Sequence, residues 1–139
     1  MRSFQGEALC WEQVDAGLEV ELKREPCNEI GTTTLRELEQ LASYIRDGAG
    51  GAQSVLFYSS RDKGFCAGAD LRELYSGIIV RQAEGATSDA IGDEARDFIE
   101  RIHRVFDTFD TAPVTTIAAV HGFCFGGGFE LALTCDIVV

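Results

Sequence analysis

Apolar and polar residues alternate along the first quarter of the chain, which is the pattern of strands that bury one face. Residues 7–14 and 18–24 follow this pattern and are predicted to be strands. The Asp-Ala-Gly sequence at 15–17 favours a tight turn, so we expect the two strands to form a β-hairpin. A loop is predicted to follow, up to residue 31.

The spacing of apolar residues then changes to the helical period. Residues 32–45 place apolar side chains three or four positions apart, which predicts an amphipathic helix that ends at the glycines of 48–51. An apolar run at 54–60 predicts a short strand, and a short helix is predicted at 71–79. Residues 81–92 are small and polar and include glycine, so we expect a mobile loop there.

The second half of the chain alternates strands and helices. Apolar residues between 98 and 109 form one face of a long helix, which Pro113 follows. A strand is predicted at 114–120, a helix at 128–134 and a further strand at 136–139. Alternation of this kind predicts an α/β fold with parallel strands.

Composition and charge restrict the classes of protein and partner. The chain has 139 residues, of which 45% are hydrophobic and 25% charged, as expected for one globular domain. It shows no apolar run near the ~20 residues of a membrane span and no secretory leader, so we expect a cytoplasmic protein. Twenty-three acidic against twelve basic residues give a net charge of −11, which argues against nucleic acid and anionic membrane as partners.

The cysteines are odd in number, and no two form a Cys-x-x-Cys pair. This argues against a disulfide framework and against a zinc site, so we expect reduced, mostly buried thiols and no bound metal. One of them, Cys66, has no base beside it in the sequence, and we interpret it as a small core residue rather than a nucleophile. The five cysteines are Cys10, Cys27, Cys66, Cys124 and Cys135.

An apolar strand, a glycine-containing loop and a helix start occur together twice, at residues 54–74 and 115–133. The first N–H groups of a helix lack intrahelical partners, so they can hold a developing negative charge. Two such loops side by side can supply two donors to one oxygen, which is an oxyanion hole. The alternative is that the glycines only permit tight turns. Phosphate-binding patterns fit poorly, because Leu131 breaks GxGxxG and Gly128 stands where GxxxxGK[ST] needs lysine.

The sequences GFCAGADL (64–71) and PVTTIAAVHGFCFGGGFELALTCDIVV (113–139) resemble the crotonase family, the enoyl-CoA hydratases and isomerases. The resemblance extends over nearly the whole chain. It implies an α/β fold, a crotonase-like spiral of ββα units that binds a CoA thioester. Family members are longer, so residues 1–139 are expected to be the N-terminal part of a truncated spiral, a partial acyl-CoA-binding domain whose C-terminal half is absent.

The resemblance also implies the site. The backbone N–H groups of Ala67 and Gly127 are expected to form an oxyanion hole that polarises the thioester carbonyl and stabilises an enolate. Loss of one such donor typically costs ~10²–10³ in rate. Coenzyme A is then part of the substrate, and no separate cofactor is expected. The residues expected to contact the CoA thioester are Cys66, Ala67, Gly68, Ala69, Asp70, Gly126 and Gly127.

Glu130 matches the position of one catalytic glutamate of the family's hydratases. It has apolar neighbours, so we expect it to be partly desolvated and to act as a general acid and base. The alternative is an ordinary glutamate in the first turn of a helix. Asp70, with Glu73 three residues later, resembles a capping box, which makes a helix cap the main alternative to a role at the site.

The histidines and basic residues are weaker candidates. His103 and His121 are expected to be structural, since neither has a nucleophile near it in the sequence. Two basic residues precede the loop at 25–28, and two precede the loop at 66–70. They either form a basic rim for the CoA phosphates or are solvated surface charges. They are Lys23, Arg24, Arg61 and Lys63.

The resemblance favours an enoyl-CoA hydratase that adds water to trans-2-enoyl-CoA, with Glu130 transferring one proton. Hydratases of the family use a second glutamate one helix–strand unit further along, so the 139 residues alone are not expected to hydrate the substrate. The alternatives are another crotonase-type enzyme, such as a hydrolase or isomerase, and a non-catalytic acyl-CoA-binding module. A homo-oligomer, a trimer or hexamer, is expected for the full-length form.

Overall fold

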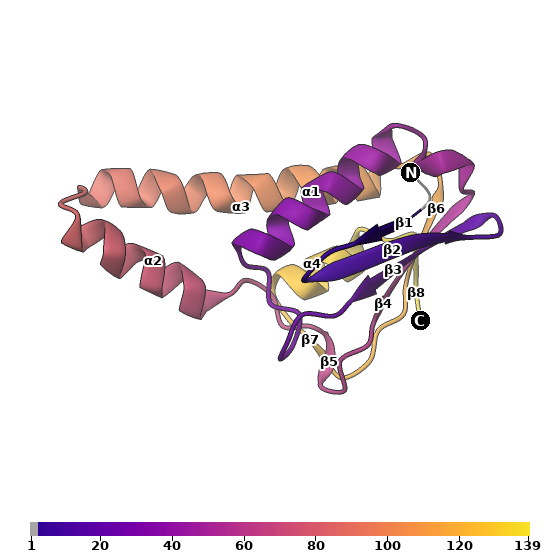
Figure 1. Ribbon diagram of the computed structural model, residues 1–139, viewed down its shortest axis with the longest axis horizontal. Coiled ribbons are helices and arrows are strands. Elements are labelled where there is room, and N and C mark those ends of the chain that lie inside the picture. Colours follow the sequence, from indigo (N-terminus) through magenta and orange to yellow (C-terminus); the bar gives the residue numbers. More distant parts are fainter. Residues whose placement is uncertain (1–2) are drawn as a thin grey trace.

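The computed structural model describes residues 3–139 and contains a large and a small β-sheet (Figure 1). The large sheet consists, in spatial order, of β1 (Ser3–Gln5), β2 (Leu9–Val14), β3 (Gly17–Leu22), β4 (Ser54–Ser59), β6 (Thr115–Ala118) and β8 (Ile137–Val138). The small sheet pairs β5 (Gly64–Cys66) with β7 (Phe123–Cys124) in parallel. The helices are α1 (Thr32–Arg46), α2 (Leu71–Ala83), α3 (Ser88–Asp110) and α4 (Gly127–Leu133), with a short 3-10 helix, η1 (Ala49–Gly51).

The predicted β-hairpin is present. β2 and β3 pair antiparallel from Leu9 opposite Leu22 to Val14 opposite Gly17. Asp15 adopts a positive φ of 51° in the turn, a conformation that aspartate tolerates better than most residues. From β3 onward the neighbouring strands β4, β6 and β8 are all parallel, which confirms the predicted α/β arrangement.

The hydrophobic core lies between the large sheet and the two helices α1 and α3, which cover one face of that sheet (Figure 1). Alternate residues of the central strands point into the core, as their apolar–polar alternation predicts. Phe57 of β4 and Phe109 of α3 are fully buried, and their ring centroids lie 5.1 Å apart. Burial of such surface is the main favourable contribution to folding.

A buried carboxylate fixes the start of β2. The Glu37 side chain of α1 is only 3% exposed, and its two oxygens accept hydrogen bonds from the N–H groups of Glu7 (2.8 Å), Ala8 (2.9 Å) and Leu9 (3.0 Å). These backbone donors would otherwise lack partners inside the protein. Glu37 therefore ties the N-terminal strands to α1.

Residues 81–92 are not a loop, which corrects the prediction for this segment. α2 continues to Ala83 and α3 already begins at Ser88, so only a short turn connects them. Thr87 caps α3, because its hydroxyl accepts a hydrogen bond from a backbone N–H of the first turn (3.2 Å), and Gly85 turns the chain with a φ of 84°. α2 has no buried residue, so its sequence carries no helical spacing of apolar residues that could have predicted its C-terminal part.

None of the helices within residues 3–139 is long and apolar enough to cross a membrane. The same part of the chain holds no group of three or more His, Cys, Asp or Glu side chains that could bind a metal ion.

Candidate functional site

The two glycine loops of the site cross each other backbone to backbone. The Phe125 N–H donates to the Cys66 carbonyl oxygen (3.0 Å). A Cβ on Gly68 would lie 2.8 Å from the Phe125 carbonyl oxygen and 3.2 Å from the Gly127 nitrogen. A Cβ on Gly128 would collide with the Cys66 carbonyl group. Glycine at these positions therefore allows an approach of two backbones that no side chain would permit.

Pairing with Ile30 sets the direction of the Ala69 amide. The Ile30 N–H donates to the Gly68 carbonyl oxygen (2.8 Å), and the Asp70 N–H donates to the Ile30 carbonyl oxygen (3.0 Å). In such a parallel bridge the bonds come from the residues on either side, so the Ala69 N–H faces away from the Ile30 backbone. The Ala69 nitrogen lies 4.0 Å from the point where Gly127 would carry a Cβ.

The amides of Ala69 and Gly127 are neighbours, and both are unpaired. Gly127 is the first residue of α4, so its N–H has no acceptor within the helix. Within residues 3–139 neither amide donates a hydrogen bond to a protein acceptor. Two adjacent backbone donors without acceptors are the arrangement that an oxyanion hole requires.

The Ala67 amide is already occupied, which contradicts its expected role as a free donor. Its N–H donates to the Cys27 carbonyl oxygen (3.0 Å). Gly68, between the two alanines, has a φ of 90°, so the chain is not a regular strand and the amides of Ala67 and Ala69 meet different surroundings. Ala69, which the sequence indicated only as a contact residue, is the unpaired donor.

Glu130 lies in the first turn of α4, where its N–H donates to the Gly126 carbonyl oxygen (2.9 Å). Its side chain is 52% exposed. The residues that the structure describes therefore do not desolvate the Glu130 carboxylate as expected. Leu131 and not Glu130 faces the core, because the two side chains lie on different sides of the helix. The Nε2 of His103 on α3 lies 4.0 Å from a Glu130 carboxylate oxygen.

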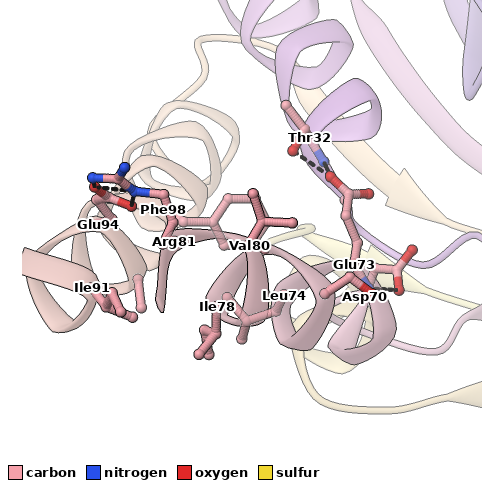
Figure 2. Close-up of a pocket in the computed structure, with 14 residues that line it drawn as sticks. Thr32, Asp70, Glu73, Leu74, Ile78, Val80, Arg81, Ile91, Glu94 and Phe98 are labelled. Atoms are coloured by element: carbon pink, nitrogen blue, oxygen red, sulfur yellow. Dashed lines mark hydrogen bonds and ion pairs between the residues drawn. The ribbon is translucent and has the colours of Figure 1, made fainter. Parts of the chain in front are cut away.

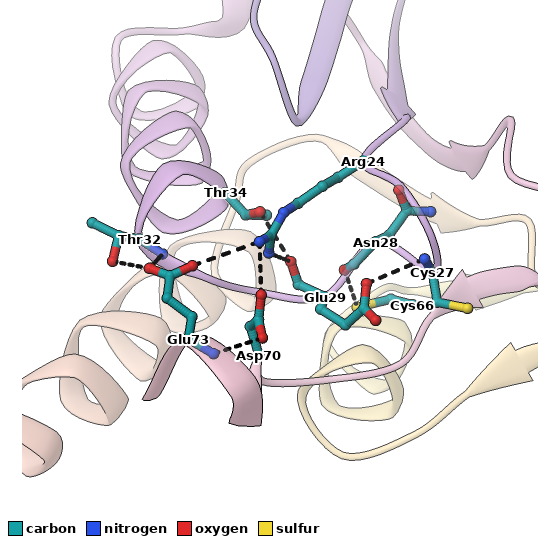
Figure 3. Close-up of polar contacts among 9 residues, drawn as sticks. All are labelled: Arg24, Cys27, Asn28, Glu29, Thr32, Thr34, Cys66, Asp70 and Glu73. Atoms are coloured by element: carbon teal, nitrogen blue, oxygen red, sulfur yellow. Dashed lines mark hydrogen bonds and ion pairs between the residues drawn. The ribbon is translucent and has the colours of Figure 1, made fainter. Parts of the chain in front are cut away.

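Asp70 is the N-cap of α2, as predicted, but the second bond of a capping box is absent, because the Asp70 N–H donates to the Ile30 carbonyl oxygen and the Glu73 carboxylate binds Thr32. The Asp70 carboxylate accepts hydrogen bonds from the Glu73 N–H (3.0 Å) and from the Arg24 guanidinium (2.7 Å), as Figure 3 shows. Burial alone would raise the pKa of Asp70, but these hydrogen bonds outweigh it and hold the pKa below its usual range. A carboxylate kept ionised in this way is suited to structure rather than to proton transfer.

The expected basic rim is only partly free. Arg24 is bound to the Asp70 carboxylate, and Arg61 forms an ion pair with Glu25. Lys23 and Lys63 form no ion pair with any residue of the described chain. The two lysines are therefore the candidates that remain for contact with CoA phosphates.

Cys66, Cys135 and His121 are not suited to act as nucleophiles. Cys66 is buried and donates to the Asn28 carbonyl oxygen (3.1 Å), and desolvation raises the pKa of its thiol to about 12. Cys135 is similar, with burial raising its pKa to about 11. His121 lies at the surface with its Nε2 2.9 Å from the Arg61 carbonyl oxygen, which is a structural contact.

A cavity of about 530 Å³ lies between the start of α1 and the helices α2 and α3 (Figure 2). Its apolar wall includes Leu74, Ile78, Ile91 and Phe98. An ion pair between Arg81 and Glu94 (2.8 Å) joins α2 to α3 at the end away from Asp70. Ala69, Gly127 and Glu130 do not line this cavity, and Asp70 is the one expected contact residue of the thioester among its lining residues.

Comparison with known proteins gives consistent results. The profile of the Enoyl-CoA hydratase/isomerase family matches residues 14–139. The fatty acid oxidation complex subunit alpha of Vibrio parahaemolyticus is 30% identical over 125 residues, which cover 90% of this chain and 16% of that protein. The mitochondrial enoyl-CoA hydratase domain-containing protein 2 of Mus musculus is 36% identical over 111 residues, covering 79% of this chain and 32% of that protein.

The fold comparison agrees. The crystal structure of an enoyl-CoA hydratase from Geobacillus kaustophilus matches with a TM-score of 0.81 at 24% identity, covering 98% of this chain and 46% of that one. The chain thus spans less than half the length of these relatives. Both crossing loops and α4 fall inside the region that the family profile covers. From these matches and from the fold, the chain belongs to the enoyl-CoA hydratase/isomerase family, the crotonases.

Proposed function

We propose that this chain binds the thioester of an enoyl-CoA and polarises its carbonyl group through the Ala69 and Gly127 amides, as part of an enoyl-CoA hydratase-type enzyme. The supporting observation is the pair of unpaired amides on two crossing loops. Their hydrogen bonds to the oxygen strengthen as negative charge develops there. Because the Ile30 pairing and the start of α4 already fix both donors, little reorganisation is needed during the reaction.

In the proposed reaction, water adds across the C2–C3 double bond of a trans-2-enoyl-CoA. Glu130 accepts a proton from water while the water oxygen bonds to C3, and the electron pair of the double bond moves onto the thioester oxygen. The two amides hold the resulting enolate. A second acid then protonates C2 to give the 3-hydroxyacyl-CoA, and the proton on Glu130 returns to that acid. By resemblance to the longer members of the family, the second acid would be a glutamate one helix–strand unit beyond Glu130, outside residues 1–139.

The exposure of Glu130 favours a second candidate function, a non-catalytic acyl-CoA-binding module. About half of the Glu130 side chain is exposed to water, so the described residues do not enclose its carboxylate around a reacting group. A crotonase-type hydrolase or isomerase would use the same two amides on a different acyl-CoA.

The remaining parts of the proposal concern contacts and setting. The acyl-CoA would lie along residues 66–70 and 126–127, with Lys23 and Lys63 near its phosphates. Coenzyme A would be part of the substrate, with no separate cofactor. A cytoplasmic location and a homo-oligomeric full-length form, trimer or hexamer, belong to the same proposal.

The test uses 2,4-hexadienoyl-CoA, whose conjugated thioester absorbs at longer wavelength when its carbonyl oxygen accepts hydrogen bonds. We expect a red shift when this compound binds to the chain and reversal of the shift by excess hexanoyl-CoA, which competes but is not conjugated. Glu130→Gln should keep the shift, because the amides and not the carboxylate polarise the carbonyl. Binding without any red shift would contradict the proposal, and so would a failure to bind.

A further inference from the structure

Arg24 connects the two segments that determine where the Ala69 amide lies. One guanidinium nitrogen donates to the Glu29 carbonyl oxygen (2.5 Å), and the other donates to the Asp70 carboxylate (2.7 Å), as Figure 3 shows. Glu29 precedes Ile30, and Asp70 follows Ala69. The guanidinium therefore crosses the same short ladder whose two backbone bonds orient the Ala69 N–H.

Glu73 extends this contact to the start of α1. Its carboxylate accepts hydrogen bonds from the Thr32 N–H (2.8 Å) and from the Thr32 hydroxyl, and lies 3.6 Å from the Arg24 guanidinium. A Cβ on Gly31 would collide with the Glu73 carboxylate and lie 2.9 Å from an Arg24 nitrogen. The absence of a side chain at Gly31 thus leaves room for the cluster of Arg24 and Glu73.

Capping of α2 does not by itself explain the contacts that Arg24 makes with Asp70 and Glu29. Asp70 already caps the helix through its bond to the Glu73 N–H, and that bond does not involve the arginine. The added contact of Arg24 with the Glu29 carbonyl fixes the opposite side of the ladder. Because the arginine side chain is 26% exposed and Asp70 only 15%, the pair is shielded more than an ordinary surface ion pair.

We propose that Arg24 is a positioning residue for the oxyanion hole: by joining the Glu29 carbonyl to the Asp70 carboxylate, it holds the Ala69 amide where it can donate to the thioester oxygen. This inference rests on the proposed function. It assigns Arg24 to the geometry of the carbonyl donor rather than to contact with CoA phosphates. Small displacements of a reacting group, on the order of 1 Å, can cost about 10²-fold in rate.

The experiment compares Arg24→Gln with a matched control, Arg101→Gln. Arg101 forms a two-bond ion pair with Glu39 between α3 and α1, and its side chain is 32% exposed, close to the value for Arg24. Both variants lose one arginine–carboxylate pair, but only Arg24 touches the Ala69 ladder. Each is measured for folding by circular dichroism, for 2,4-hexadienoyl-CoA binding by calorimetry and for the red shift of the bound compound.

We expect Arg24→Gln to lose most of the red shift while its dissociation constant rises by no more than about tenfold, or about 1.4 kcal/mol. Arg101→Gln should keep the full shift. Asp70→Asn provides a second variant that folds, because asparagine also caps helices but cannot form the ion pair. Asp70→Asn should reduce the red shift as Arg24→Gln does. Arg24→Lys should keep part of the red shift that Arg24→Gln loses.

A full red shift in Arg24→Gln and Asp70→Asn would overturn the positioning role while leaving the proposed function intact. Equal losses in Arg24→Gln and Arg101→Gln would also overturn it, since the effect would then be general destabilisation. If the unmodified chain shows no red shift, the proposed function fails first, and the positioning role fails with it.

Discussion

Gly68 and Gly127 lie in backbone contact, since a Cβ on Gly68 would come within 3.2 Å of the Gly127 nitrogen. This contact joins the loop after β5 to the start of α4 and brings the Ala69 amide beside the Gly127 amide. Gly68 and Gly128 are glycines because backbone atoms occupy the space of a side chain. Gly127 has more room, and its importance in this account lies in its N–H group.

Gly128→Ala should destabilise the chain. The added methyl group meets the Cys66 carbonyl, a backbone group that cannot move aside, so we expect a loss of about 1–3 kcal/mol in the free energy of unfolding. Gly77→Ala is the control, because a Cβ at Gly77 meets open space and alanine favours the helix by up to about 1 kcal/mol. Urea unfolding of both variants checks this, and equal stability of the two would show that the loops do not cross so closely.

Glu37→Gln should weaken the attachment of the N-terminal strands to α1. The amide has one acceptor oxygen instead of two and adds donors that face the N–H groups of residues 7–9. We expect a loss of about 2–3 kcal/mol in the free energy of unfolding. Hydrogen exchange should show the loss at the amides of Ala8 and Leu9 first. Unchanged protection at these amides would contradict the assigned role of Glu37.

The stability contribution of Asp70 should depend on pH. The pKa of the Asp70 carboxyl group is lower in the folded chain than in the unfolded chain, where an aspartate side chain titrates at about 3.9. The contribution is therefore complete above that value and is lost as the pH falls through the lower, folded pKa. Asp70→Asn should be less stable than the unmodified chain at pH 7 and nearly equal to it in strong acid. A stability difference that does not change with pH would contradict the ion pair with Arg24.

The 139-residue chain alone should not hydrate trans-2-butenoyl-CoA at the rate of a complete family enzyme. Glu130 can accept one proton, but the proposed mechanism needs a second acid to protonate C2. The measurement is the loss of enoyl absorbance, with the enoyl-CoA hydratase of Geobacillus kaustophilus as the positive control. Comparable rates would show that one carboxylate is sufficient, and the two-acid mechanism would have to be abandoned.

Sequence patterns predicted those elements that have one buried and one exposed face over several residues. The hairpin of β2 and β3 and the helix α1 belong to this class. β1, β5 and β7 are two or three residues long, too short to show a period, so they were not predicted. The last two form the small sheet that brings the glycine loops together, and the geometry of the site therefore depends on elements without a sequence signal.

Sequence patterns also could not identify which alanine supplies the amide donor beside Gly127. The sequence Cys66-Ala-Gly-Ala offers two alanine amides on either side of Gly68. The choice between them depends on the φ of Gly68 and on pairing with Cys27 and Ile30, which lie about forty residues earlier in the chain. Helix-capping chemistry, by contrast, is local, and the role of Asp70 as a cap was predicted correctly.

The most direct test of the account is the pair of variants Gly127→Ala and Gly127→Pro. Both add a Cβ, which would lie 3.3 Å from the flexible end of the Ile30 side chain, but only proline removes the N–H group. Proline is tolerated at the first position of a helix, where Gly127 lies, so α4 should still form.

The measurement is the absorbance of 2,4-hexadienoyl-CoA bound to each variant. We predict that Gly127→Ala keeps the red shift and that Gly127→Pro loses most of it, because one of the two donors to the thioester oxygen is gone. A loss of ~10²–10³ in rate is typical when an oxyanion-hole donor is removed, so the effect on the bound carbonyl should be large. A full red shift in folded Gly127→Pro would contradict the oxyanion hole formed by Ala69 and Gly127.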